Sequence, residues 1–212
     1  MNLDFFKTYI PKIQNTPLGG IEAQFKLAPS YRKKYDLISI QNKQPRLAAV
    51  MMLIFPDENN EMRFLLTKRP DYSGYHANQI SFTGGKKSEN DIDLLTTAIR
   101  ETSEEINVTI FPHQILKTLT EIYIPPSNFL VQPFIGWLSE TPEFKPNHEV
   151  EKIICPRIID LLNPNIFQYK NIQTSQGKTW KSPGFVFENE FVWGATAMML
   201  SEIKDLLEKI NK

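Results

Sequence analysis

Residues 84–108 read GGKKSENDIDLLTTAIRETSEEINV, and this stretch decides the fold more than any other part of the chain. It opens with two glycines, continues through a polar loop and ends with Glu101, Glu104 and Glu105. Residues at i, i+3 and i+4 share one face of a helix, so these carboxylates come within reach of a single small ion. Carboxylates this close repel one another unless water screens them or a cation binds them. The spacing indicates a divalent metal, although a solvated helix face is the ordinary alternative.

The same stretch predicts an amphipathic helix. At about 100° per residue, its apolar positions gather on one side and the three glutamates on another. The predicted apolar side consists of Ile92, Leu95, Ile99, Thr102 and Ile106. One face can therefore pack against a core while a separate face is acidic.

The stretch resembles the Nudix box, in which a glycine, five residues, a glutamate and seven residues precede Arg-Glu, two residues and Glu-Glu. Here Gly85 is followed by five residues, Asp91, eight residues and the segment RETSEE of residues 100–105. Asp91 thus replaces a glutamate, one residue is inserted, and Asn107 stands where a glycine is usual. After glycine, asparagine best tolerates a left-handed conformation. The aspartate and the insertion resemble the coenzyme A diphosphatase branch of the superfamily.

The preceding residues 65–85, LLTKRPDYSGYHANQISFTGG, resemble the upstream signature of that branch, approximately LLTxR, a basic residue, HxGQ and FPGG. The matching residues are Leu65, Leu66, Thr67, Arg69, His76, Gln79, Phe82, Gly84 and Gly85. Gly74 replaces the expected arginine, Asn78 the glycine and Thr83 the proline, and Pro70 stands where a small residue is usual. With Glu149-Val150 and residues 192–197, the resemblance covers about residues 45 to 207.

The resemblance implies a hydrolase that uses Mg²⁺ or Mn²⁺ to cleave a diphosphate. Carried over by motif, the metal ligands are Glu101, Glu104 and Glu105, with the Gly84 carbonyl as a further ligand. Arg100 would neutralise and orient the neighbouring carboxylates; a surface ion pair is the alternative. Asp91 would anchor the loop to the helix, unless it only caps the helix start.

Other residues near the motif are assigned roles with alternatives. Glu149 is the candidate general base because it follows a proline-containing loop and matches the family's Glu-Val position; a structural role is the equal alternative. The cations nearest the motif, Arg46, Arg69 and Lys86, are candidates for binding substrate phosphates, since an arginine fork suits phosphate oxygens. Lys86 and Lys87 are equally interpreted as solvated loop residues. A lone histidine such as His76 is more often structural.

The substrate implied by the resemblance is coenzyme A or an acyl derivative, with 3′,5′-ADP and a 4′-phosphopantetheine species as products. Because Gly74 and Asn78 replace the arginine and the glycine of the signature, a second enzyme is an alternative. It is a diphosphatase for a nucleotide sugar, ADP-ribose, NADH or a similar nucleoside diphosphate compound. A catalytically silent Nudix-fold binding module is a third reading. It is disfavoured because all three box carboxylates are present.

Composition limits the class of protein. The 212 residues suffice for one domain with a sizeable core, and 41% hydrophobic and 23% charged residues are usual for a soluble protein. Zero formal net charge gives no support for binding to nucleic acid or an anionic membrane. The single cysteine, Cys155, excludes an internal disulfide and is expected to be a small buried hydrophobe. Without an evident signal peptide or a long apolar run, the chain is expected to be cytoplasmic.

The pattern of elements predicts an α/β fold, a mixed sheet between helices, and the resemblance implies the Nudix α/β/α sandwich. A helix is expected at residues 3–13, followed by a breaker at 16–20 and a basic, irregular stretch at 28–34. The expected strands are 47–55, 63–67, 116–124, 129–138, 150–154 and 185–192, with a short helix at 160–162 and a closing helix at 195–210. Residues 1–44 are interpreted as an arm and 45–212 as the hydrolase domain, together one compact unit. The arm could cover the substrate, contact a second copy in a homodimer or be a tether; the last two are favoured.

Overall fold

The computed structural model describes residues 1–32, 34–71, 78–173 and 179–211. The α-helices are α1 (Leu3–Asn15), α2 (Gly20–Phe25), α3 (Leu37–Gln41), α4 (Leu94–Ile106) and α5 (Gly194–Ile210). The first strands are β1 (Arg46–Pro56), β2 (Met62–Phe64), β3 (Leu66–Lys68), β4 (Ile80–Ser81), β5 (Thr83–Lys86) and β6 (Ile115–Thr118). The later strands are β7 (Ile122–Ile124), β8 (Phe129–Trp137), β9 (Lys152–Ile154), β10 (Phe167–Gln173), β11 (Thr179–Phe187) and β12 (Glu190–Trp193). Short 3₁₀ helices occupy Pro112–Gln114, Pro125–Ser127, Ile158–Leu162 and Pro164–Ile166.

A mixed sheet forms the centre of the molecule. In the described part of the chain it has six strands, with the order β2-β1-β8-β6, β5 paired to β1 and β7 paired to β8. β1 and β8 run parallel, in a register that places Arg46 opposite Phe129 and Ile54 opposite Trp137. The other pairs in this sheet are antiparallel. Two smaller sheets, β10-β11-β12 and β4-β3-β9, complete the described strands.

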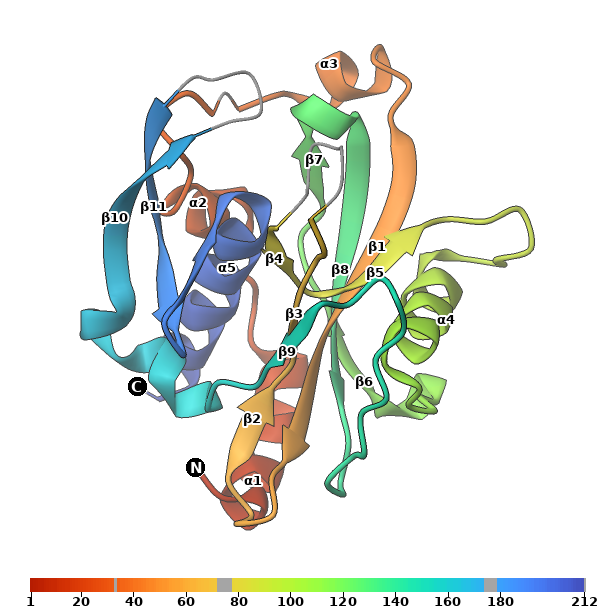
Figure 1. The fold of residues 1–212 in the computed structure, drawn as a ribbon, viewed down its shortest axis with the longest axis vertical. Helices are drawn as coiled ribbons and strands as arrows, with labels where there is room; N and C mark the ends of the chain where they lie inside the picture. The colour runs from red at the N-terminus through yellow and green to blue at the C-terminus, as the bar shows by residue number, and fades with distance from the viewer. Residues whose placement is uncertain (33, 72–77, 174–178, 212) are drawn as a thin grey trace.

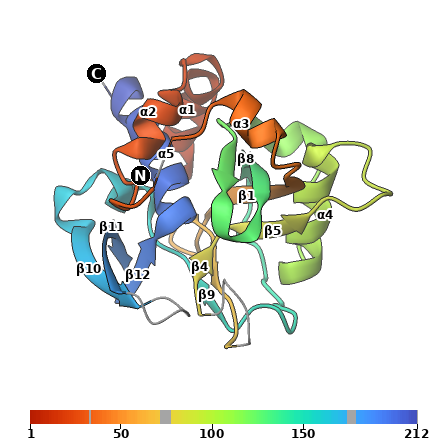
Figure 2. The same cartoon turned by 90° about the horizontal axis from the view of Figure 1, so that it is seen from above.

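Helices lie on both faces of the central sheet. Figures 1 and 2 show α4 on one side of β1 and β8, and α5 with β10–β12 on the other side. Alternate residues of β1 enter two separate cores: Ala49 and Met51 pack on the α4 side, whereas Met52 and Ile54 pack on the side of α1 and α5. A strand covered on both faces needs apolar residues throughout, which explains why residues 47–55 of β1 are all apolar. The predicted α/β/α sandwich with a mixed sheet is confirmed.

The residues before β1 are fastened to the core. Phe6, Tyr9 and Ile13 of α1 are buried in the same cluster as α5. Glu202 of α5 has no exposed surface and accepts hydrogen bonds from the Gly20 amide (3.1 Å) and the Thr120 amide (3.2 Å). It also accepts from the Thr120 hydroxyl and from the Gln24 side-chain amide, the latter at 3.2 Å. One buried carboxylate therefore joins α2, α5 and the turn between β6 and β7.

Several predicted strands are divided in the structure. Residues 63–67 were expected to form one partner of β1, but β2 pairs with β1 and β3 belongs to another sheet. Residues 116–124 form β6 and β7 instead of one strand, and residues 185–192 form part of a hairpin of β11 and β12. That hairpin turns at Glu188 and Asn189, whose φ values are 50° and 68°. Glycine and proline are absent from this turn, and its sequence therefore gave little sign of it.

Candidate functional site

The glutamate helix α4 begins and ends at polar caps. Asp93 caps the start, where its side chain accepts a hydrogen bond from the Thr96 amide at 2.7 Å. Ile92 precedes this cap and is 90% exposed, so its predicted place on the apolar helix face is wrong. The Asn107 cap at the other end has φ 55° and ψ 44°, the left-handed conformation for which the Nudix box usually has glycine. Asparagine therefore preserves the backbone at this departure from the motif.

Asp91 fastens the preceding loop to α4. The Asp91 carboxylate accepts two hydrogen bonds from Arg100, from Nε and Nη2, each at 2.8 Å. It also accepts from the Ser88 amide (2.8 Å) and the Thr97 hydroxyl (3.0 Å). The hydrogen bond from Arg100 holds the pKa of Asp91 well below its usual range. The capping role belongs to Asp93, and Asp91 makes the contacts expected of a loop anchor.

Asp91→Asn is expected to lower the free energy of unfolding by about 2–3 kcal/mol at pH 7, because it breaks an ion pair whose carboxylate is buried and whose arginine is partly exposed. The lowered pKa of Asp91 stabilises the fold above the unfolded pKa of about 4, and this contribution declines as the pH falls below that value. Urea denaturation should therefore show a smaller deficit at pH 3 than at pH 7. Asp93→Asn is the matched control, since asparagine caps helices as well as aspartate. An equal deficit in both variants, or one independent of pH, would contradict this role.

The Arg100 guanidinium also contacts two of the predicted metal ligands. Its Nη1 lies 2.8 Å from Glu101 Oε1 and 3.2 Å from Glu104 Oε2. Burial raises the pKa of Glu101, against the lowering effect of Arg100. Arg100 thus holds the Glu101 and Glu104 carboxylates in place and offsets part of their charge.

Glu105 is the most constrained of the three glutamates. Its side chain is only 5% exposed, and its Oε2 atom has no hydrogen-bond partner among the described residues. Burial raises the pKa of Glu105 to about 8, although the charge of Arg69 opposes this shift. Glu149 and Glu101 raise the pKa further by repulsion. An unpaired buried carboxylate oxygen is costly, and a cation beside it would remove that cost.

A loop fastened to the end of α4 brings Glu149 to this cluster. The Asn147 amide donates to the Glu105 carbonyl (2.9 Å), and the Asn147 side chain donates to the Glu104 carbonyl (3.0 Å). The Asn147 side-chain oxygen in turn accepts from the Glu149 amide at 2.8 Å. The half-exposed Glu149 carboxylate then lies 3.9 Å from Arg69 Nη2. Sequence reasoning missed Asn147 because its partners are backbone carbonyls, which leave no side-chain pattern.

Gly84 and Gly85 allow β5 to approach both β1 and α4. Gly84 has φ 140°, and a Cβ atom there would lie 2.2 Å from the Ala49 carbonyl oxygen. A Cβ atom on Gly85 would lie 2.3 Å from Glu101 Oε2. The glycine pair therefore lets the Glu101 carboxylate lie directly against the strand.

The predicted substrate-binding cations lie in different places. Arg69 follows β3 and is beside Glu149 and Glu105, within the cluster. Lys86 ends β5 and is exposed, one residue beyond Gly85. Arg46 begins β1, and its guanidinium carbon lies 4.1 Å from the centre of the Phe129 ring. Gly74 and His76 lie outside the described residues.

The donor set suits a hard divalent cation. In the described ranges, no three aspartate, glutamate, histidine or cysteine side chains are already grouped closely enough to hold a metal ion. In this structure Arg100 forms ion pairs with one carboxylate oxygen of Glu101 and one of Glu104. Even so, the negative charge exceeds the positive charge. The glutamate cluster has four carboxylates beside only the guanidinium groups of Arg69 and Arg100 among the described residues, and one buried oxygen of Glu105 is unpaired. Its members are Glu101, Glu104, Glu105 and Glu149. Carboxylate oxygens with an excess of negative charge are the ligands that Mg²⁺ and Mn²⁺ prefer.

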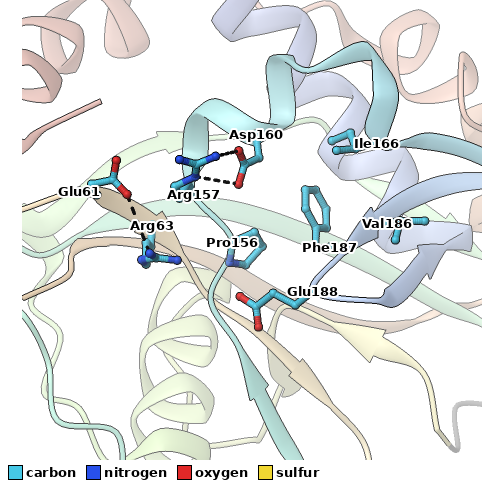
Figure 3. Close-up of a pocket in the computed structure, with 9 residues that line it drawn as sticks. All are labelled: Glu61, Arg63, Pro156, Arg157, Asp160, Ile166, Val186, Phe187 and Glu188. Atoms are coloured by element: carbon cyan, nitrogen blue, oxygen red, sulfur yellow. Dashed lines mark hydrogen bonds and ion pairs between the residues drawn. The ribbon is translucent and has the colours of Figure 1, made fainter. Parts of the chain in front are cut away.

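A separate cavity of about 360 Å³ contains none of the predicted site residues. Figure 3 shows it between β2, the turn at Arg157 and Asp160, and the end of β11. Its lining residues are Glu61, Arg63, Pro156, Arg157, Asp160, Ile166, Val186, Phe187 and Glu188. Arg157 is paired with Asp160 at 2.8 Å, and Arg63 with Asp57 at 2.6 Å. Its arginines are thus already occupied, and the glutamate cluster remains the candidate site.

Two further features are the state of the cysteine and the character of the helices. Burial raises the pKa of the Cys155 thiol to about 12, so this side chain is a neutral thiol at physiological pH. None of the helices in the described ranges combines the length and apolar character needed to cross a bilayer.

Comparisons with known proteins identify the family of this chain. Residues 45–184 match the family described as the NUDIX domain. The uncharacterized Nudix hydrolase NudL of Yersinia enterocolitica is 29% identical over 152 residues, 71% of this chain and 75% of its own length. NudL of Photorhabdus laumondii is 28% identical over 142 residues, 66% of this chain and 74% of its own.

A crystal structure of a MutT/nudix family protein from Enterococcus faecalis has the same fold. Its TM-score is 0.53 at 13% identity, and the match covers 84% of this chain and 66% of that chain, slightly less than two thirds of its length. The mixed sheet between helices is therefore that of the Nudix fold. Because the domain match covers most of the sequence, the chain belongs to the Nudix family and is a Nudix hydrolase.

Proposed function

We propose that this Nudix hydrolase cleaves the diphosphate linkage of coenzyme A or acyl-coenzyme A, giving 3′,5′-ADP and a 4′-phosphopantetheine species. The observation that carries the proposal is the cluster of four glutamates from α4 and the loop before β9, in which a buried oxygen of Glu105 is unpaired. Such a cluster is suited to a divalent cation and, with it, to a diphosphate.

Glu101, Glu104 and Glu105, with the Gly84 carbonyl, would hold Mg²⁺ or Mn²⁺. When bound, such a cation polarises a phosphoryl oxygen and offsets the charge of the diphosphate. Arg100 keeps two of these carboxylates oriented through its contacts at 2.8 and 3.2 Å. It is itself held by Asp91, so the loop and the helix form one support.

Glu149 is proposed to accept the proton of the attacking water. Its carboxylate is about half exposed, so water reaches it, while its amide is held by Asn147. Arg69, 3.9 Å away, restrains the carboxylate electrostatically and is also available to a phosphate oxygen. The same loop fastens Glu149 to α4, which keeps the base beside the three glutamates.

The coenzyme A assignment is supported by how the upstream signature folds. Asn78 replaces a glycine of the signature but has φ 58°, a left-handed conformation that glycine adopts readily. Thr83 replaces a proline and is fully buried, with its hydroxyl 3.0 Å from that of Thr102 in α4. Phe82, which matches the signature, is 1% exposed. At Asn78 the backbone conformation is therefore compatible with the glycine of the signature, whereas Thr83 makes a buried contact that a proline would lack.

A diphosphatase for ADP-ribose, NADH or a nucleotide sugar is the competing enzyme. Its catalytic groups would be the same, and the difference would lie in contacts beyond the diphosphate. A silent binding module is poorly supported, because the four glutamates and their supporting arginines are all retained.

Incubation of the purified protein with Mg²⁺ or Mn²⁺ and a panel of compounds tests the substrate. The panel is coenzyme A, acyl-coenzyme A, ADP-ribose, NADH and nucleotide sugars, with products separated by chromatography. The highest kcat/KM is expected for coenzyme A or its acyl forms, with 3′,5′-ADP as product, and a chelator should stop the reaction. If kcat/KM is higher for ADP-ribose or NADH, that compound is the substrate and the coenzyme A assignment is wrong. Binding without any hydrolysis would favour the catalytically silent binding module.

A further inference from the structure

A group of cations without acidic partners lies at the start of β1. In the described part of the chain, Arg32, Lys43, Arg46 and Lys86 form no ion pair, whereas many of the other cations do. We name the arm patch as Tyr31, Arg32, Tyr35, Lys43, Arg46 and Phe129. Its first four residues precede the segment that matches the NUDIX domain. The patch therefore combines the arm with the family's own strands.

The arm is fixed in place over the ends of β7 and β8. The Arg32 Nη2 atom donates to the Tyr123 carbonyl. The Asn128 side chain donates to the Lys43 carbonyl at 3.1 Å, and the Arg46 amide donates to the Asn128 carbonyl at 2.9 Å. These contacts give the patch a defined shape before any ligand arrives.

Aromatic rings alternate with the cations. Tyr35 packs edge-on against Tyr123 at 5.4 Å, and Lys43 Nζ lies 5.6 Å from the centre of the Tyr35 ring. Tyr31 contacts Trp180 at 4.7 Å but is still 40% exposed, so part of its surface is free to contact a ligand. An exposed aromatic beside cations is the arrangement that binds a nucleobase next to a phosphate.

Arg32 is the least satisfied cation of the patch. Its Nε atom is buried and has no hydrogen-bond partner among the described residues. The guanidinium is surrounded by Tyr31, Tyr35 and Tyr123, and burial lowers its pKa. A buried donor without an acceptor is costly, and an anion at the patch would offset the uncompensated charge.

Lys86 connects the patch with the glutamate cluster. Lys86 directly follows Gly85, against which the Glu101 carboxylate packs. In the sheet Lys86 is opposite Ala48, two residues from Arg46, so Arg46 and Lys86 point to the same face, which is the face turned away from α4. Two residues of a strand span about 7 Å, and β5 is an edge strand here, paired only with β1 in the described sheet. A ligand passing over the edge of β5 from the glutamates therefore meets Lys86 and then Arg46.

We propose that the arm patch binds the nucleotide end of the substrate, with Tyr31 against the base and Arg32, Lys43 and Arg46 around a phosphate monoester on the ribose. This inference rests on the proposed function and extends it, because it assigns the selection of a 3′-phosphorylated nucleotide to the arm. The diphosphate itself belongs at the glutamates. A second, separate phosphate with about two negative charges is what three unpaired cations match.

Titration calorimetry with two nucleotides tests the patch without turnover. The wild-type protein should bind 3′,5′-ADP about tenfold more tightly than 5′-AMP, which lacks the 3′-phosphate. Lys43→Ala and Arg46→Ala should each weaken 3′,5′-ADP binding about fivefold and leave 5′-AMP binding unchanged within twofold. Both side chains are exposed, so both variants should fold. Arg32→Gln should have the same selective effect, with folding checked by thermal melting.

Lys34→Ala is the matched control, because Lys34 is also an arm cation but is paired with Glu22 at 2.7 Å. Equal wild-type affinity for the two nucleotides, or the same loss in Lys34→Ala as in Lys43→Ala, would overturn the inference. Failure of the proposed function is a different result: 3′,5′-ADP would bind selectively through the patch while coenzyme A is not cleaved. Conversely, if Lys43→Ala and Arg46→Ala cleave coenzyme A with an unchanged KM, the proposed role of the patch is wrong while the proposed function stands.

Discussion

Glu105→Gln is expected to reduce kcat about 1,000-fold or more and, at the same time, to stabilise the metal-free protein. The carboxylate is buried, has an unpaired oxygen and has its pKa raised to about 8. Since the unfolded pKa is about 4.3, ionisation between these values opposes folding, and wild-type stability should fall as the pH rises from about 4 to about 8. Glutamine cannot ionise, so the variant should gain on the order of 2 kcal/mol at pH 7.

Thermal melting with and without Mg²⁺ separates the two effects. Mg²⁺ should raise the melting temperature of the wild-type protein, because binding to the folded state stabilises it, and should do so much less in Glu105→Gln. Glu143→Gln is the control, since the Glu143 side chain is 82% exposed and pairs with the exposed Lys145. Activity close to wild type in Glu105→Gln and in Glu104→Gln would remove the glutamate helix from the mechanism.

Glu202→Leu is expected to cost about 3–5 kcal/mol of unfolding free energy, the largest loss of stability in this set. The Glu202 carboxylate accepts from two amides, a hydroxyl and a side-chain amide. Leucine has a similar size but leaves these donors in a buried place without an acceptor. The loss should be greatest at the contact between α2 and α5.

Urea denaturation measures this loss, and hydrogen exchange should report faster exchange at the Gly20 and Thr120 amides. Glu208→Gln is the control on the same helix, because Glu208 is half exposed and forms an ion pair with Lys204. That change should cost under about 1 kcal/mol. A similar small cost for Glu202→Leu would show that the buried carboxylate does not fasten the arm.

The local features of the site could be predicted because they depend on short spacings. The position of α4, the left-handed Asn107 and the anchoring contacts of Asp91 all follow from a motif of about twenty residues. The apolar residues 47–55 likewise predicted a strand, which the structure contains as β1. In the motif the contacting residues are also neighbours in sequence, whereas β1 is recognised from its own composition although its partner strand β8 lies far along the chain.

The remaining features depend on partners far along the chain. Nothing in residues 63–67 shows that β3 leaves β2 for another sheet, because alternation identifies a strand but not its partner. Asn147 binds carbonyls of α4, which any sequence would supply. The arm is the clearest case: residues 28–34 were predicted only to be basic and irregular, and the contacts of Tyr31 with Trp180 and of Arg32 with Tyr123 could not be predicted.

The packing of α1 against α5 determines the order in which this chain can fold during synthesis. Phe6, Tyr9 and Ile13 are made before the strands β1–β12, yet the helix that covers them is α5, which follows β12. The parallel pairing of β1 with β8 likewise waits until residue 137 has been made. Such long-range contacts give a high contact order and slow folding. The apolar face of α1 therefore remains uncovered until α5 has been made, and exposed apolar surface of this kind favours aggregation of the nascent chain.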